Sequence, residues 1–195
     1  MKPYLKTIAK CFLNTFHENE ISAAKIELFL YEEEGIEDQL DKLLTEHFCP
    51  SPKDKEMLAA IEQTDEPEQI LILMKKAMCG DNRMALRKKV LSMEETITPY
   101  LLEKVLRNRQ DHFVENCLHF FLFAKKDYTE WIYEHYSEIR SEYMKSMLCV
   151  ALGVRGKAEY IPFLISECKR FLAEYPDESF DQGPYLAVKE LVNRS

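Results

Sequence analysis

The sequence predicts an all-α protein in which helical pairs stack into an α–α superhelix, and three features support this. The first is composition: the 195 residues include five glycines and eight prolines, and 46% of them are hydrophobic. So little glycine argues against a sheet protein with many tight turns, and the hydrophobic content argues against disorder. The second feature is a repeat, and the third is the placement of prolines and glycines.

Two sets of apolar residues recur at an interval of 31 residues. The first set is Leu86, Cys117 and Leu148, and the second is Val90, Phe121 and Leu152. Each member lies in a run with apolar residues at i, i+3 and i+4, which is typical of an amphipathic helix. A period of 20 to 50 residues indicates a repeat architecture. The alternative is an ordinary helical bundle whose pairs happen to have similar lengths.

Prolines and glycines mark where the helices begin and end. Each of three prolines is expected to open the second helix of a pair, because proline fits the first helical turn; they are Pro67, Pro99 and Pro162. Three glycines are expected at helix ends, where glycine is common; they are Gly35, Gly80 and Gly153.

These features predict one helical-repeat domain over residues 1–195. The expected pairs are 20–48, 53–79, 82–108, 110–139 and 141–174, with cap helices at 2–16 and 184–193. The expected core is Leu86, Val90, Leu101, Leu102, Val105, Leu118, Phe121, Trp131, Ile132, Leu148, Leu152, Phe163 and Leu164. Alignment of the repeats also assigns Tyr100, Tyr128 and Tyr133 to inward positions rather than to an aromatic binding platform.

Part of the chain resembles the HEAT/armadillo-type α-solenoid repeat proteins. The resemblance lies in Ala85-Leu-Arg-Lys-Lys-Val-Leu followed by Ile97-Thr-Pro-Tyr-Leu-Leu-Glu-Lys-Val-Leu, and in Ala158-Glu-Tyr-Ile-Pro-Phe-Leu-Ile. It covers residues 66–172 and implies a HEAT-like solenoid of about five helical pairs. The Asp-Pro turn and following Arg that are frequent in that family are missing from most units. The family mostly supplies binding surfaces, so the resemblance implies binding rather than a particular reaction.

Motifs of catalysis, nucleotide binding and metal binding are missing from the sequence. There is no GxxxxGK[ST], GxGxxG, HExxH or CxxC pattern. The six cysteines are expected to be reduced, and the His112, Cys117 and His119 group is interpreted as part of a helix core rather than a zinc site. We therefore expect no catalytic residue, no metal and no cofactor. Without an 18-residue apolar run or a signal peptide, we expect no membrane contact and a cytoplasmic location.

A basic belt, which we define as the Lys and Arg residues of 75–109, stands out in this acidic chain. It has nine Lys and Arg against four Asp and Glu, while the whole chain has a net charge of −8. Together with charged residues of later second helices, it gives the expected partner-binding set. This set is Lys75, Lys76, Arg83, Arg87, Lys88, Lys104, Arg107, Glu134, His135, Glu138 and Arg170.

Three hypotheses of function follow. The first is a non-catalytic protein–protein interaction scaffold that binds a protein partner on a concave face made of second helices. The second comes from the resemblance, because some HEAT-like solenoids are DNA-alkylation-repair glycosylases that grip duplex DNA; the belt over 75–109 would then bind phosphates. The net acidity of the chain disfavours nucleic acid. The third is a helical bundle with a small-molecule pocket.

Overall fold

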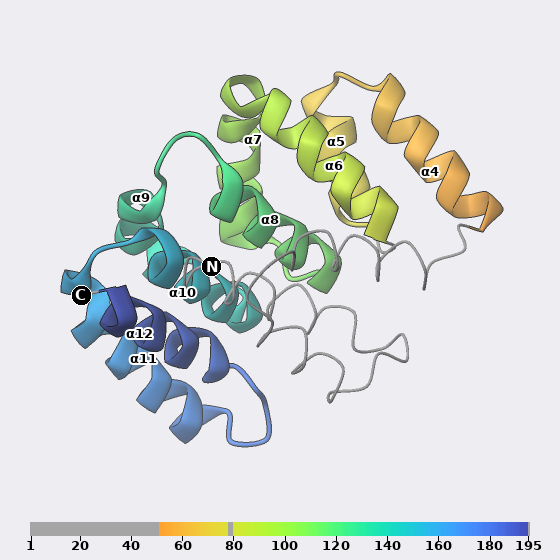
Figure 1. Cartoon of the computed structure of the whole chain (residues 1–195). Helices are drawn as coiled ribbons and strands as arrows, with labels where there is room; N and C mark the ends of the chain where they lie inside the picture. The colour runs from red at the N-terminus through yellow and green to blue at the C-terminus, as the bar shows by residue number, and fades with distance from the viewer. Residues whose placement is uncertain (1–50, 78–79, 195) are drawn as a thin grey trace.

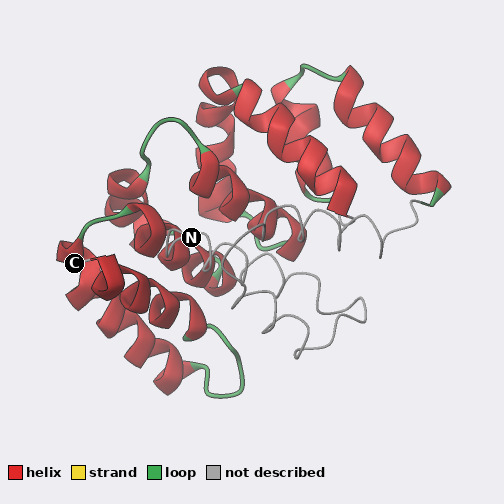
Figure 2. Ribbon diagram, in the orientation of Figure 1, coloured by secondary structure: helices red, strands yellow, loops and turns green. Residues whose placement is uncertain are grey.

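The computed structural model of the chain describes residues 51–77 and 80–194, and every regular element in these residues is helical (Figure 2). They form nine α-helices and two short 3-10 helices. The all-α prediction is therefore confirmed for the described residues. The expected helices at 2–16 and 20–48, and the glycine at position 35, lie outside them.

The helices alternate between two rows, which we call first and second helices. The first helices are α4 (Pro52–Gln63), α6 (Gly80–Ser92), α8 (Asp111–Phe123), α10 (Glu142–Arg155) and α12 (Gln182–Arg194). The second helices are α5 (Pro67–Met74), α7 (Glu94–Arg107), α9 (Thr129–His135) and α11 (Ile161–Glu174). The 3-10 helix η2 (Tyr136–Glu138) extends α9, and η3 (Ala158–Tyr160) leads into α11.

Neighbouring first helices pack on one another in chain order. Thus α4 packs on α6, α6 on α8, α8 on α10 and α10 on α12, while α5 packs on α7. Figure 1 shows the helices following an arc from α4 to α12, with α8 and α10 on its inner side and α7 and α9 on its outer side. The second helices were expected on a concave side, so their position on the outside of the arc differs from the prediction.

The prolines mark two helix starts of the three expected. Pro67 and Pro162 lie in the first turn of α5 and α11, as predicted. Pro99 does not open a helix, because α7 begins five residues earlier at Glu94. Glu94 and Glu95 lie in the first turn of α7, where negative charge interacts favourably with the helix dipole. The chain thus starts this helix with acids and carries the proline on an exposed side.

Two glycines expected at helix C-termini lie elsewhere. Gly80 begins α6, and Gly153 lies inside α10, which ends at Arg155 with Gly156 as its C-cap. A Cβ on Gly153 would overlap the main chain of Ala187 in α12. Likewise, a Cβ on Gly183 would overlap the main-chain oxygen of Ser146 in α10. These two glycines allow α10 and α12 to approach closely.

The core runs between the two rows of helices. Ten of the expected core residues are buried: Leu86, Val90, Leu101, Val105, Leu118, Phe121, Ile132, Leu148, Leu152 and Leu164. The other three, Leu102, Trp131 and Phe163, are half-buried and pack against the core. Of the inward tyrosines, only Tyr128 is buried, whereas Tyr100 and Tyr133 are exposed. The buried stripe of α7 is Ile97, Leu101 and Val105, which turns Tyr100 outward.

Candidate functional site

Three cations of the basic belt make contacts within the protein. Arg83 is only 2% exposed, and its guanidinium pairs with the carboxylate of Glu115 in α8. Arg87 lies over the Phe123 ring at 4.6 Å from the ring centre. The Nζ of Lys89 lies 2.6 Å from a carboxylate oxygen of Asp65. Arg83, which was expected to bind a partner, is therefore held in the interior.

Other belt cations face outward on or next to the second helices. Lys76 follows the end of α5 and is exposed, whereas its neighbour Lys75 is half-buried. Lys104 and Arg107 are exposed in the last turn of α7. They continue an exposed stripe that begins at Tyr100, because residues at i, i+4 and i+7 share one side of a helix. Apart from a marginal 4.0 Å contact of Lys104 with Glu103, no ion pair joins these residues to another described residue.

The predicted residues of α9 and η2 extend the same row. Glu134 and Glu138 are exposed. The imidazole of His135 stacks on the Trp131 ring, with 4.8 Å between ring centres, and its Nδ1 lies 3.0 Å from the Trp131 carbonyl oxygen. The main-chain N–H of Arg140 donates to the Leu106 carbonyl at 3.1 Å, which ties the turn after η2 to the end of α7.

We define the second-helix face as the exposed residues of α5, α7, α9 and η2, together with Lys76, which follows α5. Its members are Glu68, Gln69, Ile72, Lys76, Glu95, Thr96, Pro99, Tyr100, Glu103, Lys104, Arg107, Glu130, Tyr133, Glu134, Ser137 and Glu138. Five of the eleven expected partner-binding residues belong to it. Lys88 is exposed on α6, in the first-helix row, and so lies apart from this face.

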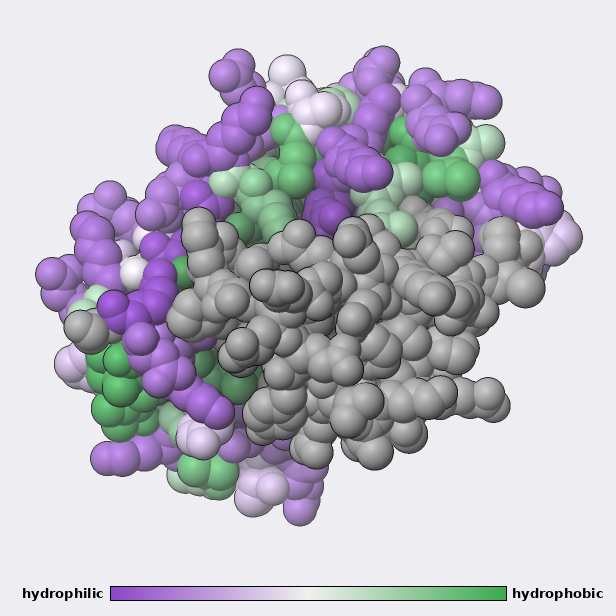
Figure 3. Space-filling view, in the orientation of Figure 1, coloured by the Kyte–Doolittle hydropathy of each residue, from purple (hydrophilic) through white to green (hydrophobic). Residues whose placement is uncertain are grey.

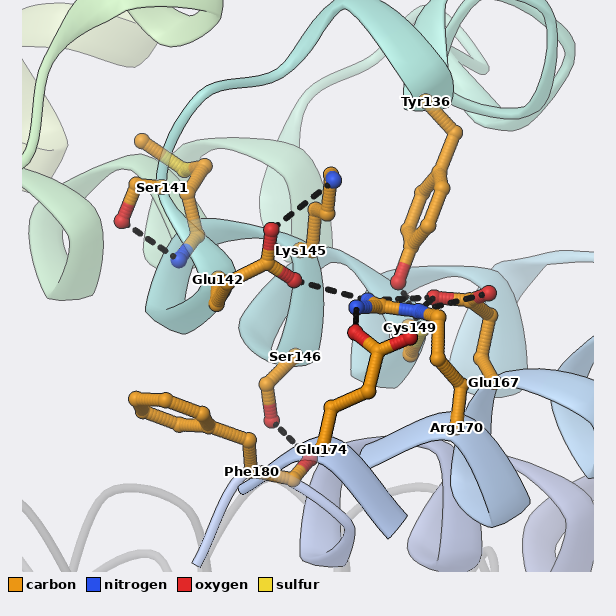
Figure 4. Close-up of polar contacts among 11 residues, drawn as sticks. Tyr136, Ser141, Glu142, Lys145, Ser146, Cys149, Glu167, Arg170, Glu174 and Phe180 are labelled. Atoms are coloured by element: carbon orange, nitrogen blue, oxygen red, sulfur yellow. Dashed lines mark hydrogen bonds and ion pairs between the residues drawn. The ribbon is translucent and has the colours of Figure 1, made fainter. Parts of the chain in front are cut away.

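Arg170 belongs to a separate ion-pair network between α10 and α11 (Figure 4). Its guanidinium contacts Glu142 at 2.7 Å, Glu167 at 2.8 Å and Glu174 at 3.0 Å. Lys145 contacts the other oxygen of Glu142 at 3.0 Å. Although burial acts to raise the pKa of Glu142, the hydrogen bonds from Arg170 and Lys145 hold it below its ordinary value. This arrangement joins two helices and leaves Arg170 with its charge already paired.

A partly buried polar cluster around Glu115 was not expected from the sequence. Glu115 accepts from Arg83, lies 3.4 Å from the Tyr143 hydroxyl and lies 3.6 Å from Nδ1 of His112. The cluster therefore joins α6, α8 and α10. Arg83 and Glu115 are 32 residues apart, which is nearly one repeat. From this spacing, the contact between the two side chains on adjacent first helices could have been predicted.

A second unexpected polar centre is Glu94, at the start of α7. Its carboxylate accepts from the main-chain N–H groups of Lys125 and Lys126 at 2.8 and 2.9 Å, and Tyr128 donates at 3.2 Å. Burial alone would raise the pKa of Glu94, but these hydrogen bonds outweigh burial and lower it. An open groove of about 720 Å³ lies beside it. Because the polar atoms of Glu94 are bonded to the α8–α9 loop, the carboxylate fixes that loop.

The thiols that the structure describes are not activated. Burial raises the pKa of Cys117, and burial followed by the charge of Glu167 raises that of Cys149 to about 12 despite a hydrogen bond with Tyr136. A reactive cysteine needs the opposite shift. Within residues 51–77 and 80–194, no three His, Cys, Asp or Glu residues are grouped as metal ligands would be. In the same part of the chain, no helix has the length and apolar character needed to cross a bilayer.

Comparison of the chain with known protein families, curated proteins and solved structures finds no match. Its function must therefore be argued from the contacts described above.

Proposed function

We propose that the protein is a non-catalytic scaffold of the HEAT-like α-solenoid type, which binds a protein partner on its second-helix face. The packing of each first helix on the next in chain order supports the solenoid, because repeat proteins are built from such nearest-neighbour contacts. Each helical pair within residues 52–174 also occupies a range close to one repeat.

The observation that carries the proposal is the Tyr100–Lys104–Arg107 stripe on α7. An exposed aromatic ring with adjacent cations is a composition typical of protein interfaces, where tyrosine and arginine contribute strongly. Ile72 on α5 and Lys76, two residues after the end of that helix, are also an exposed apolar residue and an exposed lysine, and α5 packs against α7. We infer a partner segment with apolar and acidic side chains.

The charges on the face favour protein over nucleic acid. Glu103, Glu134 and Glu138 are exposed on the same row of helices as the cations. Phosphate binding needs a continuous run of positive charge, whereas mixed charge suits a partner with a matching pattern. The scaffold is thus preferred to the DNA-repair alternative.

Photo-crosslinking in the cells that express the protein tests this proposal. A photoreactive residue replacing Tyr100 is expected to give a discrete crosslinked protein, and one replacing the exposed Lys157 is not. The K104E/R107E variant should reduce the Tyr100 crosslink at least tenfold, because it inverts the charge of the stripe. The K53E/K55E variant changes net charge equally on α4 and should leave the crosslink unchanged.

Two results would overturn the proposal. One is a Tyr100 crosslink pattern identical to that from Lys157. The other is a gel shift of duplex DNA that weakens steeply with salt and is lost in K104E/R107E, since this would assign the face to nucleic acid.

A further inference from the structure

Helices α11 and α12 carry an apolar surface that no described residue covers. Three large side chains are more than half exposed, namely Leu172 (55%), Val192 (57%) and Tyr185 (59%), and Ile165 is 41% exposed. Figure 3 shows hydrophobic side chains among hydrophilic ones at this end of the molecule, where α11 and α12 lie side by side in Figure 1. We call this surface the end face.

The end face points away from the preceding helical pair. On α11, Phe163 and Arg170 contact η2 and α10, and Ile165 and Leu172 lie on the other side of the same helix. On α12, Gly183 and Ala187 press against α10, and Tyr185 and Val192 lie opposite them. Each helix therefore turns its exposed apolar residues away from α10.

Both helices carry the same pattern on this face. An apolar residue is followed by a lysine at i+4 and an apolar residue at i+7: Ile165, Lys169 and Leu172 on α11, and Tyr185, Lys189 and Val192 on α12. Both lysines are exposed, and no described acidic side chain pairs with either. The two helices pack against each other and are joined by a short connection, so they run in opposite directions. Lys169 and Lys189 therefore lie near the middle of the end face, and the apolar residues lie toward its two ends.

We propose that the end face binds an amphipathic helix of another protein, one with an apolar stripe flanked by acidic residues. A helix laid along α11 and α12 would cover apolar residues from both and would bring carboxylates to Lys169 and Lys189. A second copy of this chain fits less well, because a two-fold axis through the face would place the lysines of the two copies together. This surface is separate from the second-helix face, so the inference does not depend on the proposed function.

Binding of two synthetic helical peptides to the full chain tests the inference by fluorescence anisotropy. Both peptides have the same leucine stripe, but one has glutamate flanks and the other lysine flanks. The glutamate peptide should bind at least tenfold more tightly than the lysine peptide, and salt should weaken its binding. K169E/K189E should reverse the preference between the peptides. L172S/V192S should weaken binding of the glutamate peptide at least tenfold. The thermal unfolding midpoint should stay nearly unchanged in this variant, because both residues are exposed.

Several outcomes would overturn the inference. They are equal binding of the two peptides, no binding of either, and glutamate-peptide binding that persists in L172S/V192S. Sedimentation of the chain alone provides a further measurement. A dimer that dissociates in L172S/V192S would identify a second copy as the occupant and would contradict the proposal. K53E/K55E changes net charge equally on α4 and serves as the matched control, because it should leave the binding of both peptides unchanged. Loss of glutamate-peptide binding in K104E/R107E but not in K169E/K189E would place the peptide on the second-helix face and would contradict the inference.

Discussion

Two first helices, α8 and α10, are more deeply buried than two second helices, α7 and α11. In α8, nine of thirteen residues are buried, and in α10 nine of fourteen are. In α7 four of fourteen residues are buried, and in α11 only Leu164 and Phe171 are. Helices α8 and α10 are enclosed by their neighbours, whereas α7 and α11 each have one buried side and one exposed side.

This difference separates the residues that stabilise the fold from those available for binding. Burial of apolar surface is the dominant stabilising contribution, and α8 and α10 supply much of it. Tyr100, Lys104 and Arg107 lie outside the buried stripe of α7, so their side chains are accessible to a binding partner. We therefore expect large effects of substitution at the many buried positions of α8 and α10, and small effects at the exposed positions of α7.

The largest effect is expected from Phe113→Ala in α8. The Phe113 side chain is fully buried, and truncation of a buried phenylalanine costs about 3–5 kcal/mol of stability. Tyr100→Ala on α7 should change the free energy of unfolding by no more than about 0.5 kcal/mol. Urea unfolding of both variants checks the contrast. Similar losses of unfolding free energy in the two variants would contradict the expected difference between α8 and α7.

A loss of about 1–3 kcal/mol is expected from Gly153→Ala in α10. Helix propensity alone predicts the opposite sign, because alanine is better than glycine inside a helix by about 1 kcal/mol. The added methyl would overlap the main chain of Ala187, and overpacking of this kind is destabilising. Urea unfolding gives the sign of the change in the free energy of unfolding. That sign shows whether packing or helix propensity has the larger effect where α10 contacts α12.

The double variant Gly153→Ala/Ala187→Gly is the control for that prediction. Removal of the Ala187 methyl relieves part of the overlap, so the double variant should lose less stability than the sum of the single variants. Strict additivity would show that the two residues do not press against each other.

A pH-dependent effect of about 2 kcal/mol is expected from His119 in α8. Burial, followed by the positive charges of Arg83 and Arg87, lowers the pKa of His119 to about 3, below the value of about 6.5 in an unfolded chain. Between these values the unfolded state binds the proton and the folded state does not, so stability falls as pH falls below 6.5. From pH 7 to pH 5 this amounts to about 2 kcal/mol.

His119→Gln isolates this contribution, because glutamine does not titrate. The loss of stability between pH 7 and pH 5, measured by urea unfolding, should be about 2 kcal/mol smaller in the variant than in the natural chain. An equal loss in both proteins would mean that His119 takes up its proton in the folded state as readily as in the unfolded one.

Periodicity in the sequence predicted the all-α class and ten buried core residues, because apolar residues at helical spacing determine which side of a helix faces inward. Pro99 was misassigned because a proline can also lie inside a helix, where it removes one i→i−4 hydrogen bond, and because α7 begins at Glu94, whose contact with the α8–α9 loop is not visible in the local sequence. Gly153 and Arg83 were misassigned for a related reason. Their roles depend on Ala187 and Glu115 in other helices, and the local sequence does not contain such contacts.

The smallest effect, about 1 kcal/mol, is expected from Arg170→Met in α11. The network of Arg170 with three glutamates joins α10 to α11, but its side chain is partly exposed, so water and salt weaken each pair. Because the folded-state pKa of Glu142 is lowered, its contribution is present near neutral pH and is lost as pH falls through that pKa. The difference between Arg170→Met and the natural chain should therefore shrink below about pH 4 and in 1 M salt. Lys104→Met is the matched control and should show no such pH dependence. A larger, salt-independent loss for Arg170→Met would mean that Arg170 stabilises the fold mainly by packing over the Phe171 ring rather than through its ion pairs.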